Sequence, residues 1–253
     1  MYNKSIFKGI MAAAALVGLI GAMPAGAATQ TFDFDDDFQN FTGGNVNGNS
    51  LVLSNNGVSL TVTGWADTGG TNDNLIRDAR LYWANNNALG VINRDESNDS
   101  PNHAVDNVSS NDFDMLLLEF SEAVNLEAID FNWVGNDSDV SILAWNGGSG
   151  NLNGETWSSI LATNGGEWDH EDNYSNVGTA YYSVNAGNIE SSKWLIGAYN
   201  PVYGNGWTSG NDAFKLDLVS TSTRDKPPGE VPVPGTLALI LLGAAGLRAR
   251  KRK

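Results

Sequence analysis

The chain has 253 residues, contains no cysteine, and carries 29 acidic residues against 14 Lys and Arg. The lack of cysteine excludes disulfides, a Cys-based zinc site and a cysteine nucleophile. The acidic balance argues against nucleic acid as a partner, because binding to phosphates needs a basic surface. Divalent cations and polyhydroxyl ligands are compatible with this charge.

Residues 1–27 have the three parts of a secretory signal peptide. Lys4 and Lys8 give a positive start, and residues 9–23 form an apolar stretch rich in Ala, Leu, Ile and Gly. Ala25 and Ala27 match the small-x-small rule for cleavage, so the mature chain is expected to begin at Ala28. The export machinery and a signal peptidase are therefore expected partners.

Residues 28–221 are expected to form one exported all-β domain, an antiparallel β-sandwich of jelly-roll type. Short apolar runs alternate with clusters of Asn, Gly, Ser, Thr and Asp, which favour turns. A short helix or a strand is expected over residues 157–162. The predicted strands cover residues 31–34, 51–53, 58–65, 80–83, 88–92, 114–120, 126–134, 140–145, 179–184, 193–199 and 213–219. Period-two alternation places four side chains of the seventh strand toward the core: Glu127, Ile129, Phe131 and Trp133.

Residues 222–230 are predicted to be a linker, and residues 231–253 form a segment in three parts. The segment opens with Pro232, Val233, Pro234 and Gly235, which interrupt any preceding strand or helix. Residues 236–247 are apolar and uncharged; as a helix they would span roughly 18 Å, short of the ~30 Å hydrocarbon core of a bilayer. The basic tail at 248–253 contains Arg248, Arg250, Lys251, Arg252 and Lys253.

This three-part order resembles the PEP-CTERM sorting signal, in which a Pro-Glu-Pro motif, a short transmembrane helix and a basic cluster are read by an exosortase. Val233 stands where that motif has its central Glu. Phrases in the body also resemble exosortase-dependent surface proteins: residues 103–107, 116–120, 135–145, 194–199 and 211–215. The resemblance implies a transient stage at the inner membrane, then the cell surface or extracellular matrix. It supplies no reaction, no known ligand and no catalytic residues. The function expected for the exported domain is a structural or binding role in that matrix, with extracellular polysaccharide as a partner.

Calcium is the metal that the sequence favours, because Ca²⁺ takes six to eight oxygen ligands. Asp33, Asp35 and Asp37 follow the first predicted strand, and Asn211 and Asp212 open the last one. First and last strands often lie together in a jelly roll, so these oxygens are expected to converge. The loop at residues 136–139, Asn-Asp-Ser-Asp, is a second candidate. The alternative is that both sets are solvated turn residues.

A carbohydrate-binding module is an alternative function, because aromatic faces stack on sugar rings. Trp168, Tyr174 and Trp207 lie in polar stretches and are the candidate ligand-binding residues. Trp157 lies in a similar stretch. Core positions are expected instead for Trp65, Trp83, Trp133, Trp145 and Trp194.

A glycan-cleaving enzyme is a further alternative, because such enzymes need two carboxylates beside the glycosidic bond. Residues 167–172 combine acids with one of only two histidines, and Glu167 and Asp169 are the candidates there. An acidic loop that faces solvent explains the same residues. No serine-hydrolase elbow or His-Glu-x-x-His motif is present. The favoured function is therefore binding or matrix building without catalysis.

Overall fold

The computed structural model describes residues 28–34, 41–67, 74–83, 88–94, 103–108, 112–204 and 206–224. The predicted signal peptide and sorting segment lie outside these residues, as do Asp35 and Asp37. Residues from Ala27 to Asp225 form one compact unit. Within the described residues no helix is long and apolar enough to cross a bilayer.

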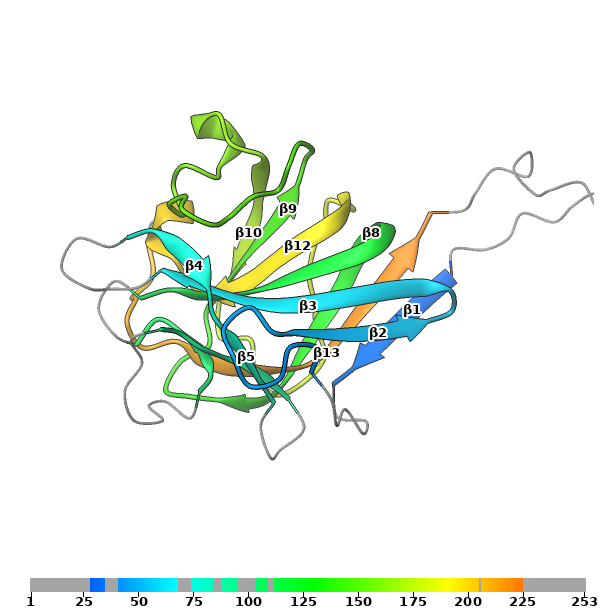
Figure 1. The fold of residues 1–253 in the computed structure, drawn as a ribbon, viewed down its shortest axis with the longest axis horizontal. Coiled ribbons are helices and arrows are strands. Elements are labelled where there is room, and N and C mark those ends of the chain that lie inside the picture. The colour runs from blue at the N-terminus through cyan, green and yellow to red at the C-terminus, as the bar shows by residue number, and fades with distance from the viewer. Residues whose placement is uncertain are drawn as a thin grey trace, which may run out of the picture. The chain divides into compact units, whose positions relative to one another are not determined.

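The unit is all-β, as predicted, and its strand ladders are antiparallel (Figure 1). Two short 3-10 helices, η1 (Ala162–Asn164) and η2 (Pro201–Tyr203), lie in the connections. The strands are β1 (Ala28–Asp33), β2 (Ser50–Asn55), β3 (Val58–Asp67), β4 (Ile76–Asp78), β5 (Arg80–Trp83), β6 (Leu89–Ile92), β7 (Val105–Asp106), β8 (Asp114–Val134), β9 (Val140–Trp145), β10 (Trp168–Tyr174), β11 (Tyr182–Ser183), β12 (Glu190–Ala198) and β13 (Ala213–Thr223).

The long strand β8 joins two groups of strands. Its first part, up to Phe120, lies between β12 and β3, and its second part, from Asn125, pairs with β13. On β12 the register jumps from Ser191, opposite Val124, to Lys193, opposite Glu119. Four residues of β8 therefore oppose a single residue of β12, and such a bulge bends the strand. The two strands predicted at 114–120 and 126–134 are the two parts of β8.

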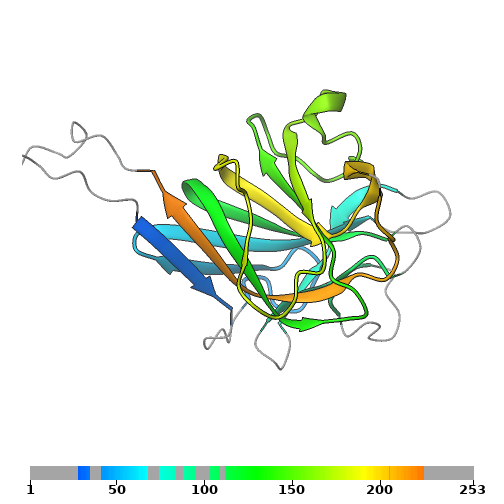
Figure 2. The ribbon, with the colours of Figure 1, turned by 180° about the vertical axis from the view of Figure 1, so that it is seen from behind.

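The two groups of strands pack in a sandwich-like arrangement. One group has the order β10-β9-β12-β8-β3-β2, and the other places β13 between β8 and β1. Figure 2 shows β13 and β1 side by side. The main core contains side chains from both groups, among them Leu116, Leu118, Trp194, Phe214 and Val219.

The first group is also covered on its other face. Met115, Leu117, Leu143 and Leu195 alternate with main-core residues and belong to a second apolar cluster. That cluster is completed by residues of the connection between β9 and β10, including Trp157 and Ile160. Burial on both faces explains why β8 and β9 contain nearly continuous apolar runs.

Several predicted strands have different bounds in the structure. Residues 157–160 form turns, Leu161 forms a single bridge with Trp168, and Ala162 begins η1, so no strand lies at 157–162. β11 is only two residues long. β13 continues to Thr223, so the first two residues of the predicted linker are strand. In the second part of β8, Ile129 and Phe131 are in the core as predicted, but Glu127 and Trp133 are only half-buried. Leu126, from the opposite set, is also in the core because register shifts interrupt the alternation.

The stretch predicted as an acidic loop forms strand β10. β9 is the only strand with which Trp168–Tyr174 pairs in the described part of the chain, apart from a single bridge between Trp168 and Leu161, so β10 is an edge strand. Trp168 alone among them is fully buried. Charged residues on an edge strand hinder pairing with another chain, which accounts for the polar sequence.

Candidate functional site

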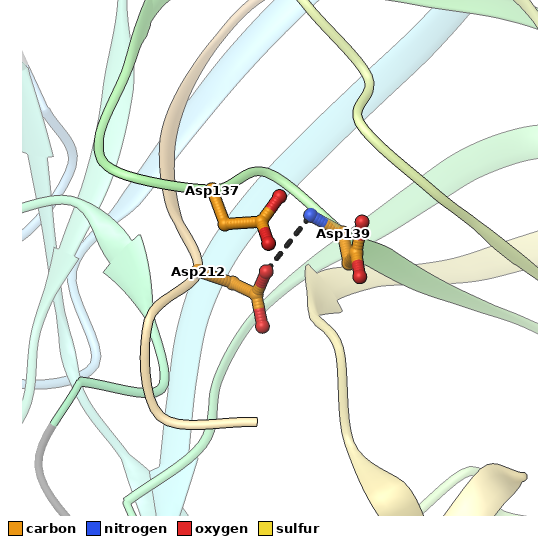
Figure 3. A group of neighbouring side chains, drawn as sticks. All are labelled: Asp137, Asp139 and Asp212. Atoms are coloured by element: carbon orange, nitrogen blue, oxygen red, sulfur yellow. Dashed lines mark hydrogen bonds between the residues drawn. The ribbon is translucent and has the colours of Figure 1, made fainter. Parts of the chain in front are cut away.

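Three aspartates from two distant segments meet at one corner of the unit (Figure 3). Asp137 and Asp139 lie in the connection from β8 to β9, and Asp212 immediately precedes β13. One carboxylate oxygen from each lies within 4.8 Å of the others. The backbone brings them together, because Ala213 N donates to Asp137 O at 3.0 Å and Gly135 N donates to Ala213 O at 2.7 Å.

Asn107 fixes the position of Asp212. Its Nδ2 donates to Asp212 Oδ2 at 2.7 Å, and its Oδ1 accepts from Asp212 N at 2.9 Å. Asp139 N donates to the other oxygen, Asp212 Oδ1, at 3.0 Å, the bond drawn in Figure 3. Because Asn107 also donates to Tyr199 O at 2.7 Å, the corner is tied to the end of β12.

The corner concentrates negative charge in a buried place. Asp139 is 5% exposed and Asp212 is fully buried, whereas Asp137 is half-buried. The pKa of Asp212 is raised to about 6, chiefly by burial and also by the charges of Asp139 and Asp137, while the hydrogen bonds from Asn107 and Asp139 N act to lower it. Burial also raises the pKa of Asp139. Among the described residues, no salt bridge reaches this corner.

These groups have the chemistry of a hard-cation site. Carboxylate and amide oxygens are the ligands that Ca²⁺ prefers, and a divalent cation relieves repulsion between clustered carboxylates. Asn211 supplies a further oxygen nearby, because its Nδ2 donates to Asp137 Oδ2 at 3.0 Å. Its Oδ1 is buried and has no hydrogen-bond partner among the described residues.

The structure brings together residues from both predicted calcium sets. Asp212 and Asn211, from the first set, meet Asp137 and Asp139, from the second. Asp33 is not with them, because β1 runs antiparallel to β13 and places Asp33 opposite Leu218. At about 3.3 Å per residue, it lies roughly 20 Å along β13 from Asp212. The prediction for Asp35 and Asp37 lies outside the described residues.

The predicted ligand-binding aromatics do not form one surface. Trp168 lies in strand β10, so the prediction that it lies in a loop is wrong. It is 1% exposed and belongs to the second apolar cluster. Tyr174 O–H donates to Glu171 at 2.8 Å and accepts from Asn185 N at 2.7 Å, so its hydroxyl is engaged within the fold. Trp207 is 40% exposed, with its ring 5.3 Å from that of Tyr199. Trp157, from a similar polar stretch, is also buried. Trp194 is in the core, as predicted.

The two candidate catalytic acids take part in local hydrogen bonds. Glu167 accepts from Gly150 N at 2.5 Å and from Ser149 Oγ at 3.2 Å, and these bonds lower its pKa. A carboxyl with a lowered pKa is a poor general acid at neutral pH. Asp169 accepts from Asn146 Nδ2 at 3.2 Å.

Comparisons with protein-family models, curated proteins and solved structures find no match for this chain.

Proposed function

We propose that this chain is an exported protein of the cell surface or extracellular matrix, sorted through an exosortase after a stage at the inner membrane. It acts as a structural or binding protein of an exopolysaccharide matrix, without chemistry of its own. The observation that carries the proposal is the pairing of a signal-peptide pattern at residues 1–27 with a sorting pattern at residues 231–253. Between them lies a cysteine-free, acidic all-β unit, which we propose to be a jelly-roll-like sandwich.

The sorting proposal is tested by fractionating host cells that express either the full chain or a chain ending at Glu230. We expect the full chain at the surface or in the matrix, and the shortened chain in the periplasm or medium. A variant with the five C-terminal cations replaced by Gln serves as a second test, because it keeps the apolar segment. Unchanged surface delivery of both variants would contradict the proposal.

Calcium binding at the corner of Asp137, Asp139 and Asp212 is the second part of the proposal. It is supported by three converging carboxylates, two of them buried, and by the buried oxygen of Asn211. The site would fasten the start of β13 to the connection between β8 and β9. A cation that binds only the folded state stabilises it by about 2.7 kcal/mol at a hundredfold excess over Kd.

The calcium prediction is tested with Asp137→Asn. In the wild-type chain, calcium chloride should raise Tm and a chelator should lower it, whereas Asp137→Asn should remove most of the difference. Asp130→Asn is the matched control, because both residues are half-buried and each accepts from the next backbone N–H, at 2.9 Å for Asp137 and 2.8 Å for Asp130. A wild-type Tm that is insensitive to millimolar calcium would overturn the assignment.

A further inference from the structure

One lysine of β13 is largely buried although it carries a charge. Lys215 is 7% exposed. Its neighbours Phe214 and Leu216 belong to the main core, so Lys215 projects from the opposite face of the strand. Lysine is rarely buried in proteins unless its charge is paired. Among the described residues, however, no salt bridge reaches Lys215.

Two aromatic rings flank the Lys215 ammonium. Its Nζ lies 5.5 Å from the centre of the Trp133 ring and 5.9 Å from the centre of the Tyr82 ring, and it is over both rings. Cation–π contacts of this kind offset part of the cost of removing an ammonium from water, but they bring no opposite charge. Burial lowers the pKa of Lys215, in keeping with a charge that is only partly compensated.

These three side chains lie in one row across four strands. Trp133 of β8 is opposite Lys215 of β13. The antiparallel register of β13 and β6 puts Gly90 next to Lys215, and Gly90 is in turn opposite Tyr82 of β5. A side chain at position 90 would stand between Lys215 and Tyr82. It would also collide with the chain, because a Cβ on Gly90 would lie 1.8 Å from His103 O.

The row offers three hydrogen-bond donors to a ligand at the surface. The Lys215 ammonium, the Trp133 Nε1–H and the Tyr82 hydroxyl have no hydrogen-bond partner among the described residues. None of these three atoms is among the enclosed, unpartnered polar atoms of the same residues, so each reaches solvent. Trp133 and Tyr82 are themselves partly exposed.

Lys193 shows how the same fold pairs another lysine. Its Nζ also lies near an indole, 5.3 Å from the centre of the Trp145 ring. In addition, it forms a salt bridge of 2.8 Å with Glu119 Oε1. Lys215 has the aromatic contacts without a carboxylate, and a bound anion would supply the counter-charge that Glu119 provides for Lys193.

The charge and the rings of this row select the class of ligand. One ammonium matches one singly charged acidic group, whereas a neutral molecule would leave it unpaired and a cation would be repelled. The partly exposed rings offer apolar surface for a sugar ring. We propose that Trp133, Lys215 and Tyr82 bind one acidic sugar unit, a uronate or a sulfate ester, through its anionic group. This rests on the proposed matrix function, which supplies the polysaccharide.

The test measures binding of methyl glucuronide and of glucose 6-sulfate to the full-length chain. The chain is purified in a detergent without a sugar or acidic headgroup, and a chelator keeps calcium from bridging ligand and protein. Saturable binding of at least one acidic sugar is expected by calorimetry, with a rise in Tm, and the sugar that binds identifies the acidic group. Methyl glucoside is the matched neutral ligand and should bind roughly tenfold more weakly or not at all.

Lys215→Met keeps an unbranched stem and removes the charge. It should fold, because replacing a buried ion by an apolar side chain of similar volume is often neutral or stabilising. It should weaken binding of the acidic sugar roughly tenfold or more. Trp133→Phe keeps a ring but removes the Nε1 donor, and should weaken binding roughly fivefold, which provides a second variant.

Lys193→Met is the matched control. It removes one positive charge and one contact with an indole, as Lys215→Met does, but at a lysine that already has a carboxylate partner. It should bind as the wild type does. The proposal is overturned if neither acidic sugar binds, if methyl glucoside binds equally well, if Lys215→Met binds normally, or if Lys193→Met weakens binding as much. Binding is measured on purified protein and sorting on cell fractions, so the two proposals can fail separately.

Discussion

Replacing Asp67 by Asn is expected to stabilise the protein at pH 8 and to have much less effect at pH 5. The pKa of Asp67 is raised from 3.8 to about 7 in the folded state, mainly by burial. Between these values the folded state holds a proton that the unfolded state has lost, so the free energy of unfolding falls as pH rises. Asn does not titrate, and its Oδ1 can still accept from Phe113 N.

The gain from Asp67→Asn should therefore grow by about 3 kcal/mol between pH 5 and pH 8. Urea unfolding followed by tryptophan fluorescence measures it, and the range stays above the sequence pI of 4.3. Taking the difference between variant and wild type removes the contributions of the other carboxyl groups. Asp130→Asn, at another half-buried aspartate, is measured in parallel as the control for the Asp-to-Asn substitution itself. Parallel stability curves for Asp67→Asn and the wild type would refute the expected titration.

Trp168→Ala should cost roughly 3–5 kcal/mol in the free energy of unfolding, the range for deleting a large core aromatic. Trp168 is 1% exposed and packs in the second apolar cluster with Trp157 and Leu161. Truncation would leave a cavity between the first group of strands and the connection that covers it. A residue that served only as a surface platform for sugars would lose binding and leave stability unchanged.

Trp207→Ala is the control for this prediction, because Trp207 is 40% exposed. It should change stability by less than about 1 kcal/mol. Chemical unfolding of both variants measures the contrast. Equal stability losses would show that Trp168 does not have the core role inferred from its burial.

The strands that are buried on both faces could be predicted from the sequence. Residues 114–120 and 140–145 are apolar at nearly every position, and the structure has β8 and β9 there. The limits of β8 could not be predicted, because residues 121–123 are partly or fully exposed and resemble a turn. In the structure they are the outer part of a bulge within one strand.

Edge strands gave a weaker signal. Among the described strands β10 pairs only with β9, and its residues after Trp168 are mostly charged or polar and at least partly exposed, a pattern that is also typical of loops. The sequence pattern therefore predicts a loop around Trp168. Burial of this residue depends on the covering connection between β9 and β10, a tertiary contact that local periodicity does not encode.

The acidic corner could be predicted in parts but not as a whole. Both acidic segments stand out in composition, and the expected proximity of the first and last strands is correct. The antiparallel register of β1 on β13, however, carries Asp33 away from Asp212, whereas a separate parallel bridge pairs Asp137 with Asp212. That register depends on the full strand order, which a single sequence leaves open.

The most direct measurement of the central claim is the intact mass of the protein recovered from the surface fraction of cells that express the full chain. The predicted result is the mass of a chain that begins at Ala28 and that has lost the basic residues of the 231–253 segment. Recovery of the unprocessed chain from Met1 to Lys253 in the cytoplasmic fraction, with none at the surface, would contradict the account.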